Sequence, residues 1–328
     1  MTISVIVPTK NHSTDLEKCL ASIQKQSKKP FEKIVVAFPD GDVETTAKKY
    51  GFRVVYDKKK TIGNAYRVGA KAAKGDIVLF IDDDSEAPKD LIKKFSSAFS
   101  KDPKMDVIGG NDRLPSRLPG KSKDFQEAAY QTDLAIRPKE KISGNDAWKW
   151  LRAACIAYRK SSLKKQSFDS RLLGLQEQEL HVRMKKAGMK ALYDPSIFVY
   201  HKRRTSLKGI WDQIHRNGKA KIDLIRIHRL SVLGIEDIVS LGLMPLAILF
   251  ALLSWDRILF LGLTTTQFWI LLIIFLNIII KPAIILWHAQ NKTGKYLKLI
   301  EIIFIKEIAY MGGLLVGIIE ALLGRRKL

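Results

Sequence analysis

The segment of residues 74–86, KGDIVLFIDDDSE, constrains the fold of this chain more than any other. Its five consecutive apolar residues, Ile77–Ile81, predict a strand buried on both faces, as in a parallel sheet. Three carboxylates, Asp82, Asp83 and Asp84, follow directly, and like charges this close repel one another. Ligands bind at the carboxyl edge of open parallel sheets, and carboxylate oxygens there suit Mg²⁺ or Mn²⁺. The alternative is an acidic turn that begins the next helix.

Strands and helices are predicted to alternate along the first 110 residues. Besides Ile77–Ile81, strands are expected at 3–7, 34–38, 52–56 and 107–108, and helices at 14–26, 43–50, 62–74 and 90–99. Short turns join these elements, which predicts a doubly wound α/β domain. Residues 111–147 are less periodic. Beyond them we expect strands at 153–158, 191–193 and 197–200 and a helix at 176–187.

The net charge of +23 predicts an anionic partner, such as nucleic acid, a membrane surface or phosphates. Nine of the basic residues fall within 201–230, directly before long apolar runs, and the chain has no recognised nucleic-acid-reading module. We therefore expect no nucleic-acid partner. Cys19 and Cys155 lack metal-ligand spacing and are predicted to be buried thiols in a reducing compartment. No signal peptide is visible, so the α/β domain is expected in the cytoplasm.

Two uncharged apolar runs, 238–255 and 258–280, each have about the length of a bilayer-spanning helix. A third run, 299–323, contains four charged residues and could cross the membrane or turn back near Gly312 and Gly313. The positions of Lys and Arg between the runs favour two spans and a re-entrant or interfacial third segment. The basic segment before the runs carries Trp211 and Ile222 on one helical face, and it could lie in the membrane interface or pack as an ordinary helix.

These patterns divide the chain into three expected regions. Residues 1–200 form the α/β domain, 201–236 form basic amphipathic interface helices, and 237–328 form a membrane domain. The expected location is the cell membrane, with several membrane passes and the α/β domain on the cytoplasmic face.

Several motifs occur in a recognisable order: VIVPTKN, LEKCLASIQKQS, GNAYRVGAKAAKGD, FIDDDSEAP and, at 176–180, QEQEL. Ordered motifs are far more specific than any one of them. Together, over residues 3–230, they resemble the inverting GT-A glycosyltransferases of family 2, whose second half carries an acidic E-D-x-E-L motif. With the apolar C-terminal runs, the chain is most similar to membrane-bound members that build exopolysaccharide or lipid-linked glycans. The resemblance implies a Rossmann-like nucleotide-diphospho-sugar transferase domain followed by transmembrane helices.

The resemblance also implies a metal and donor site. Asp82 and Asp84 occupy the two acids of the family's D-x-D motif, and His201 matches a histidine that lies near the metal in some members. These three residues are expected to hold Mg²⁺ or Mn²⁺. The expected contacts to the nucleotide-sugar donor are Pro8, Thr9, Asp40, Gly63, Asn64, Asp82 and Asp83.

Glu177 stands at the position of the family's catalytic base, where the usual residue is Asp. Glu179 is a competing candidate, although in a helix it points well away from Glu177. Gln213 and Arg216 resemble part of the Q-x-x-R-W motif of processive synthases and are expected to bind the acceptor or a phosphate. The tryptophan of that motif is replaced in this chain. In the donor segment, Tyr66 and the following arginine replace the usual Arg-Asn pair.

The implied reaction moves a sugar from a nucleotide-diphosphate sugar to a hydroxyl of a lipid-linked or polysaccharide acceptor. An alternative is a polyprenyl- or dolichyl-phosphate hexose synthase, in which the acceptor is a lipid phosphate that needs no general base. A non-catalytic membrane protein that binds anionic lipid is a third hypothesis. Nucleotidyl transfer is disfavoured, because residues 8–11, PTKN, are not the Gly-rich basic loop that such enzymes place after the first strand.

Overall fold

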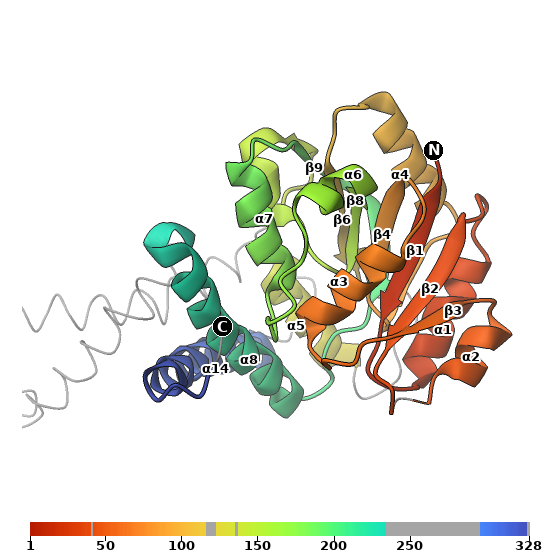
Figure 1. The fold of residues 1–328 in the computed structure, drawn as a ribbon. Coiled ribbons are helices and arrows are strands. Elements are labelled where there is room, and N and C mark those ends of the chain that lie inside the picture. The colour runs from red at the N-terminus through yellow and green to blue at the C-terminus, as the bar shows by residue number, and fades with distance from the viewer. Residues whose placement is uncertain (41, 116–122, 135–136, 234–295, 327–328) are drawn as a thin grey trace, which may run out of the picture. The chain divides into compact units, whose positions relative to one another are not determined.

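The computed structural model of the protein describes residues 1–40, 42–115, 123–134, 137–233 and 296–326. They fall into two compact units (Figure 1). The first unit comprises Met1–Pro119 and Arg137–Arg203, and the second comprises Gly120–Ile136 and Arg204–Leu328. The apolar runs predicted to span the membrane at 238–255 and 258–280 lie outside the described residues. The predicted division at residues 200 and 236 stays a prediction.

The first unit is built on one mixed sheet. Its described strands are β1 (Ile3–Pro8), β2 (Glu32–Ala37), β3 (Arg53–Tyr56), β4 (Ile77–Ile81), β5 (Ser85–Glu86), β6 (Val107–Arg113), β7 (Ile142–Ser143), β8 (Cys155–Arg159) and β9 (Ala191–His201). Their order is β3-β2-β1-β4-β8-β6-β9-β5, with β7 paired to β9. The strands β1 to β4 are mutually parallel, but β8 runs antiparallel to both β4 and β6. The strand β4, which precedes the three acids, is therefore parallel to only one neighbour, and the sheet is not the wholly parallel one that the apolar run of β4 predicts.

Helices cover both faces of this sheet (Figure 1). They are α1 (Thr14–Gln24), α2 (Glu44–Lys49), α3 (Ile62–Ala72), α4 (Leu91–Lys101), α6 (Lys160–Lys165) and α7 (Gln176–Lys186), with a 3₁₀ helix, η2, at Gly144–Trp150. Because side chains alternate along a strand, β4 serves two cores. Ile77, Leu79 and Ile81 pack in the core of α1, α2 and α4, whereas Val78 and Phe80 pack in the core of α3, α6 and α7.

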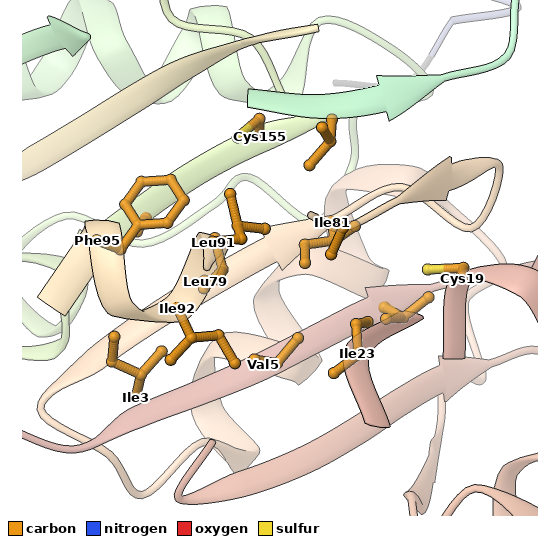
Figure 2. Close-up of a cluster of buried hydrophobic side chains, with 14 of the residues drawn as sticks. Ile3, Val5, Cys19, Ile23, Leu79, Ile81, Leu91, Ile92, Phe95 and Cys155 are labelled. Carbon is orange, nitrogen blue, oxygen red and sulfur yellow. The ribbon is translucent and has the colours of Figure 1, made fainter. Parts of the chain in front are cut away.

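Figure 2 shows the first of these cores. Leu79 and Ile81 lie there beside Ile23 of α1 and among side chains from α4. Cys19 and Cys155 are buried in the same core as free thiols, which confirms their predicted burial. The apolar packing on both faces holds β4 in place, and this fixes the backbone position at which the three acids begin.

The strand β6 is longer than its sequence predicts. A strand is expected at 107–108, but β6 runs through two glycines to Arg113, with a register shift against β9 between Gly109 and Asn111. A Cβ on Gly110 would lie 2.6 Å from the carbonyl oxygen of Ile197, so only glycine allows this close approach. The sequence does not predict this extension, because residues 111–113 are polar and the strand with which they pair, β9, is distant in the chain. That partner, β9, is one continuous strand where two short ones are predicted.

The second unit is helical in its described residues. It contains α5 (Lys123–Leu134), α8 (Leu207–His228), the short η3 (Arg229–Val232) and α14 (Tyr296–Leu322). Apolar side chains of α5, α8 and α14 share a core that includes Phe125, Ile210 and Ile302. Ile222 is buried and Trp211 is exposed, so α8 packs part of its apolar face within this unit.

The helix α14 corrects one prediction. Of the two alternatives for the third apolar run, the turn near Gly312 and Gly313 does not form, because α14 continues through both residues to Leu322. The glycines serve packing instead, since a Cβ on Gly313 would lie 2.1 Å from the carbonyl oxygen of His215 on α8. Within α14, Lys298–Leu322 has a mean hydropathy of 2.0 and is long and apolar enough to cross a membrane. Among the described residues, it is the one helix that meets these criteria.

Candidate active site

The three acids after β4 have different partners. Asp82 accepts a hydrogen bond from the Tyr66 hydroxyl at 3.1 Å, and Asp83 accepts one from Thr9 Oγ1 at 2.5 Å. Asp84 Oδ1 lies 3.0 Å from His201 Nε2. The acidic turn is therefore tied to α3, to the end of β1 and to the end of β9 at once. These three elements fix the direction of each carboxylate.

Asp82, Asp84 and His201 converge as a candidate metal site. One ligand atom from each lies within 4.8 Å of the others. Strand pairing explains the convergence, because β5 follows the acids directly and pairs Ser85 with His201 on β9. Two carboxylates and an imidazole suit a divalent ion such as Mn²⁺. The donor set therefore fits the metal that the sequence predicts.

The electrostatics of this edge also favour a cation. The pKa of Asp82 is raised to about 7, chiefly by burial; His201 lowers it, and the negative charges of Asp84 and Asp83 raise it. The cost of ionising Asp82 thus comes from lost hydration and from like charges. A bound divalent cation offsets both effects, since it replaces water and adds opposite charge.

Glu177 lies near the start of α7 and is buried. Burial raises the pKa of its carboxyl, while the charge of Arg152 lowers it. Burial also raises the pKa of the Tyr66 phenol, and the charges of Asp82 and Glu177 raise it further. Tyr66 is therefore within electrostatic range of both the acidic turn and Glu177. The charges of Asp82 and Glu177 therefore both act on this phenol, and the role of Glu177 as the base stays a prediction.

Glu179, the competing candidate for the base, is held elsewhere. Its two carboxylate oxygens each accept a hydrogen bond of 2.7 Å from Arg183, one turn further along α7. The side chain is buried. Both oxygens of Glu179 are occupied by the Arg183 guanidinium, which makes this carboxylate a poor proton acceptor. Glu177 is therefore the better candidate for a base.

The residues expected to bind the donor occupy the same edge of the sheet. Pro8 ends β1, and Thr9 continues it by donating its N–H to Val36 O at 2.8 Å. Asp40 follows β2, is exposed, and forms an ion pair of 2.8 Å with Lys60. The donor roles of these residues and of Asp83 stay predictions.

Two expected donor residues at the start of α3 have packing partners. A Cβ on Gly63 would lie 2.1 Å from the carbonyl oxygen of Asp169, so glycine is required there for the loop to approach α3. The Asn64 side chain donates to the buried Asp57 carboxylate. These contacts give both residues a structural purpose, and their donor roles stay predictions.

Gln213 and Arg216 belong to α8 in the second unit. Gln213 accepts a hydrogen bond of 3.4 Å from Arg204, and Arg216 is exposed. Their predicted role in acceptor or phosphate binding stays a prediction.

Sequence reasoning missed the surroundings of His201. Asp112, on the extended end of β6, is buried and forms ion pairs with Arg137 and Arg203. It also lies 3.5 Å from His201 Nδ1. The sequence gives one weak signal for Asp112, namely that it follows two consecutive glycines after an apolar strand.

A separate hollow lies beside α3 and α7. Its volume is about 530 Å³, and its lining residues are Lys59, Arg67, Lys165, Gln166, Ser167, Phe168, Asp169, Ser170, Arg171 and Arg183. Arg67 Nη1 lies 3.4 Å from Ser170 Oγ, to which it donates. Arg67 thus faces this hollow, whereas its neighbour Tyr66 faces Asp82.

Comparison with known proteins points to one family. Residues 4–165 match the family model described as Glycosyl transferase family 2. An uncharacterized glycosyltransferase from Haemophilus influenzae is 28% identical over 109 residues, which are 32% of this chain and 37% of that relative. The chain therefore spans little more than a third of this curated relative.

Solved structures share the fold. The mannosyltransferase PcManGT from Pyrobaculum calidifontis, solved with GDP-Man and Mn²⁺, aligns with a TM-score of 0.61 and 16% identity, over 95% of this chain and 86% of that one. Glucosyl-3-phosphoglycerate synthase from Mycobacterium tuberculosis, solved with Mn²⁺, UDP-Glc and phosphoglyceric acid, aligns with a TM-score of 0.50 and 18% identity, over 72% and 81%. At these identities the likeness establishes the fold alone.

Proposed function

Residues 4–165 of this chain are a glycosyl transferase family 2 domain of the Rossmann-like GT-A fold, and from this premise we propose that the protein transfers a sugar from a nucleotide-diphosphate sugar to an acceptor hydroxyl. The observation that carries the proposal is the convergence of Asp82, Asp84 and His201 at the sheet edge, with Glu177 around the same tyrosine. This arrangement supports a cation site at the sheet edge, with Glu177 as the proposed base for the same reaction.

Asp82, Asp84 and His201 would hold Mg²⁺ or Mn²⁺. When bound, such a cation neutralises the charge that develops on the leaving diphosphate. The neighbouring folds solved with GDP-Man or UDP-Glc and Mn²⁺ support this assignment of donor class and metal. Thr9 and Tyr66 orient Asp83 and Asp82 through their hydroxyl groups, so the acids are arranged before the donor binds.

Glu177 would accept the proton of the acceptor hydroxyl as its oxygen attacks the anomeric carbon. The attack comes from the face opposite the leaving diphosphate, so a single displacement inverts the anomeric configuration. Burial raises the pKa of Glu177 and so makes it a stronger base than an exposed carboxylate.

A second candidate function is transfer to a lipid phosphate. It is favoured by the second unit, in which α8 carries the exposed Arg216 and shares a core with the apolar helix α14. An ionised phosphate needs no base, so Glu177→Gln would retain turnover with this acceptor. With a sugar hydroxyl as acceptor, the same substitution would reduce turnover by a factor of about 10² to 10⁴.

We also propose that the protein is anchored in the cell membrane by several helices, with the glycosyltransferase domain on the cytoplasmic face. The apolar helix α14 supports membrane association. The lengths of the uncharged runs at 238–255 and 258–280 support several passes. The expected acceptor is therefore a lipid-linked or polysaccharide glycan at that surface.

The decisive experiment screens nucleotide sugars with the full-length protein in detergent or nanodiscs. Metal-dependent release of a nucleotide diphosphate by wild type, lost in Asp84→Asn, would support the proposal and identify the donor. Membrane lipid extract is added to supply an acceptor. If no donor reacts even then, the acidic turn is structural and the proposal is wrong.

A further inference from the structure

His201 lies between two carboxylates that come from different strands. Its Nε2 is 3.0 Å from Asp84 Oδ1, and its Nδ1 is 3.5 Å from Asp112 Oδ2. Nδ1 is buried and makes no hydrogen bond of normal geometry with the described part of the chain. One ring nitrogen thus faces the candidate metal site, and the other faces Asp112.

Asp112 is a fixed negative charge. Its residue is 2% exposed, and its Oδ1 and Oδ2 pair with Arg137 and Arg203 respectively. The two arginine side chains are themselves only 10% and 14% exposed. Two guanidinium groups offset the cost of burying this carboxylate, and their directed hydrogen bonds hold it in place.

Without a cation, His201 has a carboxylate at each ring nitrogen, and Asp84 attracts a hydrogen on Nε2 just as Asp112 attracts one on Nδ1. Once a cation lies between Asp84 and His201, Nε2 must present its lone pair to that cation, and the ring hydrogen is then on Nδ1. A lone pair on Nδ1 would point at the negative Asp112 Oδ2 and be repelled, whereas an N–H there is attracted. With the hydrogen on Nδ1, the lone pair is on Nε2, which faces Asp84 and the candidate metal site. A metal ligand needs that lone pair, and a fixed carboxylate beside the other nitrogen favours one orientation of the ring.

We propose that Asp112 is a positioning residue of the metal site, which stabilises the metal-binding tautomer and orientation of His201 while Arg137 and Arg203 fix Asp112. The inference rests on the metal-binding part of the proposed function and extends it to three residues that would not contact the metal themselves. It also gives a purpose to the extension of β6 beyond its glycines, because that extension brings Asp112 to His201.

The test measures Mn²⁺ binding to the full-length protein in detergent without donor, from the electron paramagnetic resonance signal of free Mn²⁺. Asp112→Asn should weaken Mn²⁺ binding by about 10- to 100-fold, the range found when a metal ligand loses the group that supports it. His201→Ala should also weaken it. In the double variant Asp112→Asn/His201→Ala, removal of Asp112 should cause no further loss, because it acts only through His201.

Pulsed spectra provide a readout that a merely structural role would not change. Nitrogen coupling from a coordinated imidazole should appear in wild type, vanish in His201→Ala and decrease in Asp112→Asn. The matched control is Asp194→Asn, which alters another buried aspartate, on β9, whose partners are Lys141 and Ser196. This control should bind Mn²⁺ like wild type.

Two results would overturn the inference: unchanged Mn²⁺ affinity in Asp112→Asn, or losses that simply add in the double variant. Should Asp112→Asn fail to fold, Asp112→Glu replaces it in the same cycle, since it keeps the charge that Arg137 and Arg203 require. A wild type that binds no Mn²⁺ would instead refute the metal part of the proposed function, so the two failures are distinguishable.

Discussion

Tyr66 stands where the family pattern usually has an arginine, and its contacts explain how the site accepts the change. The ring is 1% exposed and stacks on Phe80 with centroids 4.6 Å apart. The hydroxyl donates to Asp82 at 3.1 Å. A neutral donor orients Asp82 without cancelling its charge, which leaves that charge available to a cation.

Tyr66→Phe tests this interpretation. It keeps the stacked ring but removes a hydrogen bond to a carboxylate, which is worth about 1.5–3 kcal/mol. If about half of that acts on the transition state, kcat/KM should fall roughly tenfold. Steady-state kinetics at saturating Mn²⁺ measure the loss.

The control for Tyr66→Phe is Tyr158→Phe, a change of the same kind in the same aromatic cluster. The Tyr158 hydroxyl lies 2.8 Å from His181 Nε2 and, within the described part of the chain, forms no hydrogen bond with the acidic turn. Its loss should reduce kcat/KM far less. Equal losses in the two variants would assign the effect to packing and not to Asp82.

Glu177 gives a prediction about pH. Burial raises the pKa of its carboxyl above the usual 4.5, and a base must be deprotonated to act. Activity should therefore rise with pH through this raised pKa, so the acid limb of kcat/KM lies above pH 4.5. Stopped assays across pH 4–9 with a hydroxyl acceptor measure the limb.

Loss of metal could produce a similar limb, so the pH dependence of Mn²⁺ binding is measured separately. The assignment to Glu177 requires that Mn²⁺ remain bound across the limb. A limb centred at or below 4.5 with metal bound would contradict the buried-base assignment.

At the residue scale, the sequence predicts the candidate metal ligands better than the residues that orient them. Asp82, Asp84 and His201 are predicted together because family motifs keep a fixed order, and the structure brings their ligand atoms within 4.8 Å. Asp112 has no such motif. Its position depends on pairing between strands that are about 80 residues apart in the chain, which local patterns do not encode.

At the element scale, the packing of α8 against α14 rests on glycines. A Cβ on Gly313 would lie 2.1 Å from the carbonyl oxygen of His215, whereas a Cβ on the adjacent Gly312 would lie 3.6 Å from the His215 ring. The first approach requires a backbone shift, and the second is an ordinary van der Waals contact. Neighbouring glycines of one helix thus have opposite roles.

Substitution of each glycine by alanine should have opposite effects. Gly313→Ala should lower the free energy of unfolding by about 1–3 kcal/mol through overpacking. Gly312→Ala should raise it by roughly 0.5–1 kcal/mol, because alanine loses less conformational entropy in a helix. Thermal unfolding in one detergent measures both. Equal effects of the two would show that this helix contact is absent in solution.

Elements with a strong local pattern are predicted well from the sequence. The strand Ile77–Ile81 is found as expected, because a short uninterrupted run of apolar, partly β-branched residues is typical of a strand buried on both faces. The antiparallel pairing of β8 with β4 is not predicted, because the apolar sequence of β4 is compatible with either a parallel or an antiparallel neighbour. For α14, composition shows an apolar helix but not whether glycines interrupt it or pack it.

At the scale of the whole molecule, two forces could bring the chain to a membrane. The net charge of +23 attracts anionic lipid at long range. A helix as long and apolar as α14 could also insert into the hydrocarbon of the bilayer. Salt distinguishes these forces, because the Debye length falls to about 3 Å at 1 M ionic strength.

Membranes from cells that express the full-length protein should therefore retain it through a wash in 1 M NaCl and through a wash in alkaline carbonate. Attachment by charge alone would be lost in 1 M NaCl, because salt screens the attraction between exposed basic side chains and anionic lipid. Spanning helices survive both washes, because transfer of about 20 apolar residues from the bilayer to water is strongly unfavourable. Immunoblots of pellet and supernatant measure the partition. Release by salt alone would assign the attachment to the basic surface and refute the proposed membrane spans.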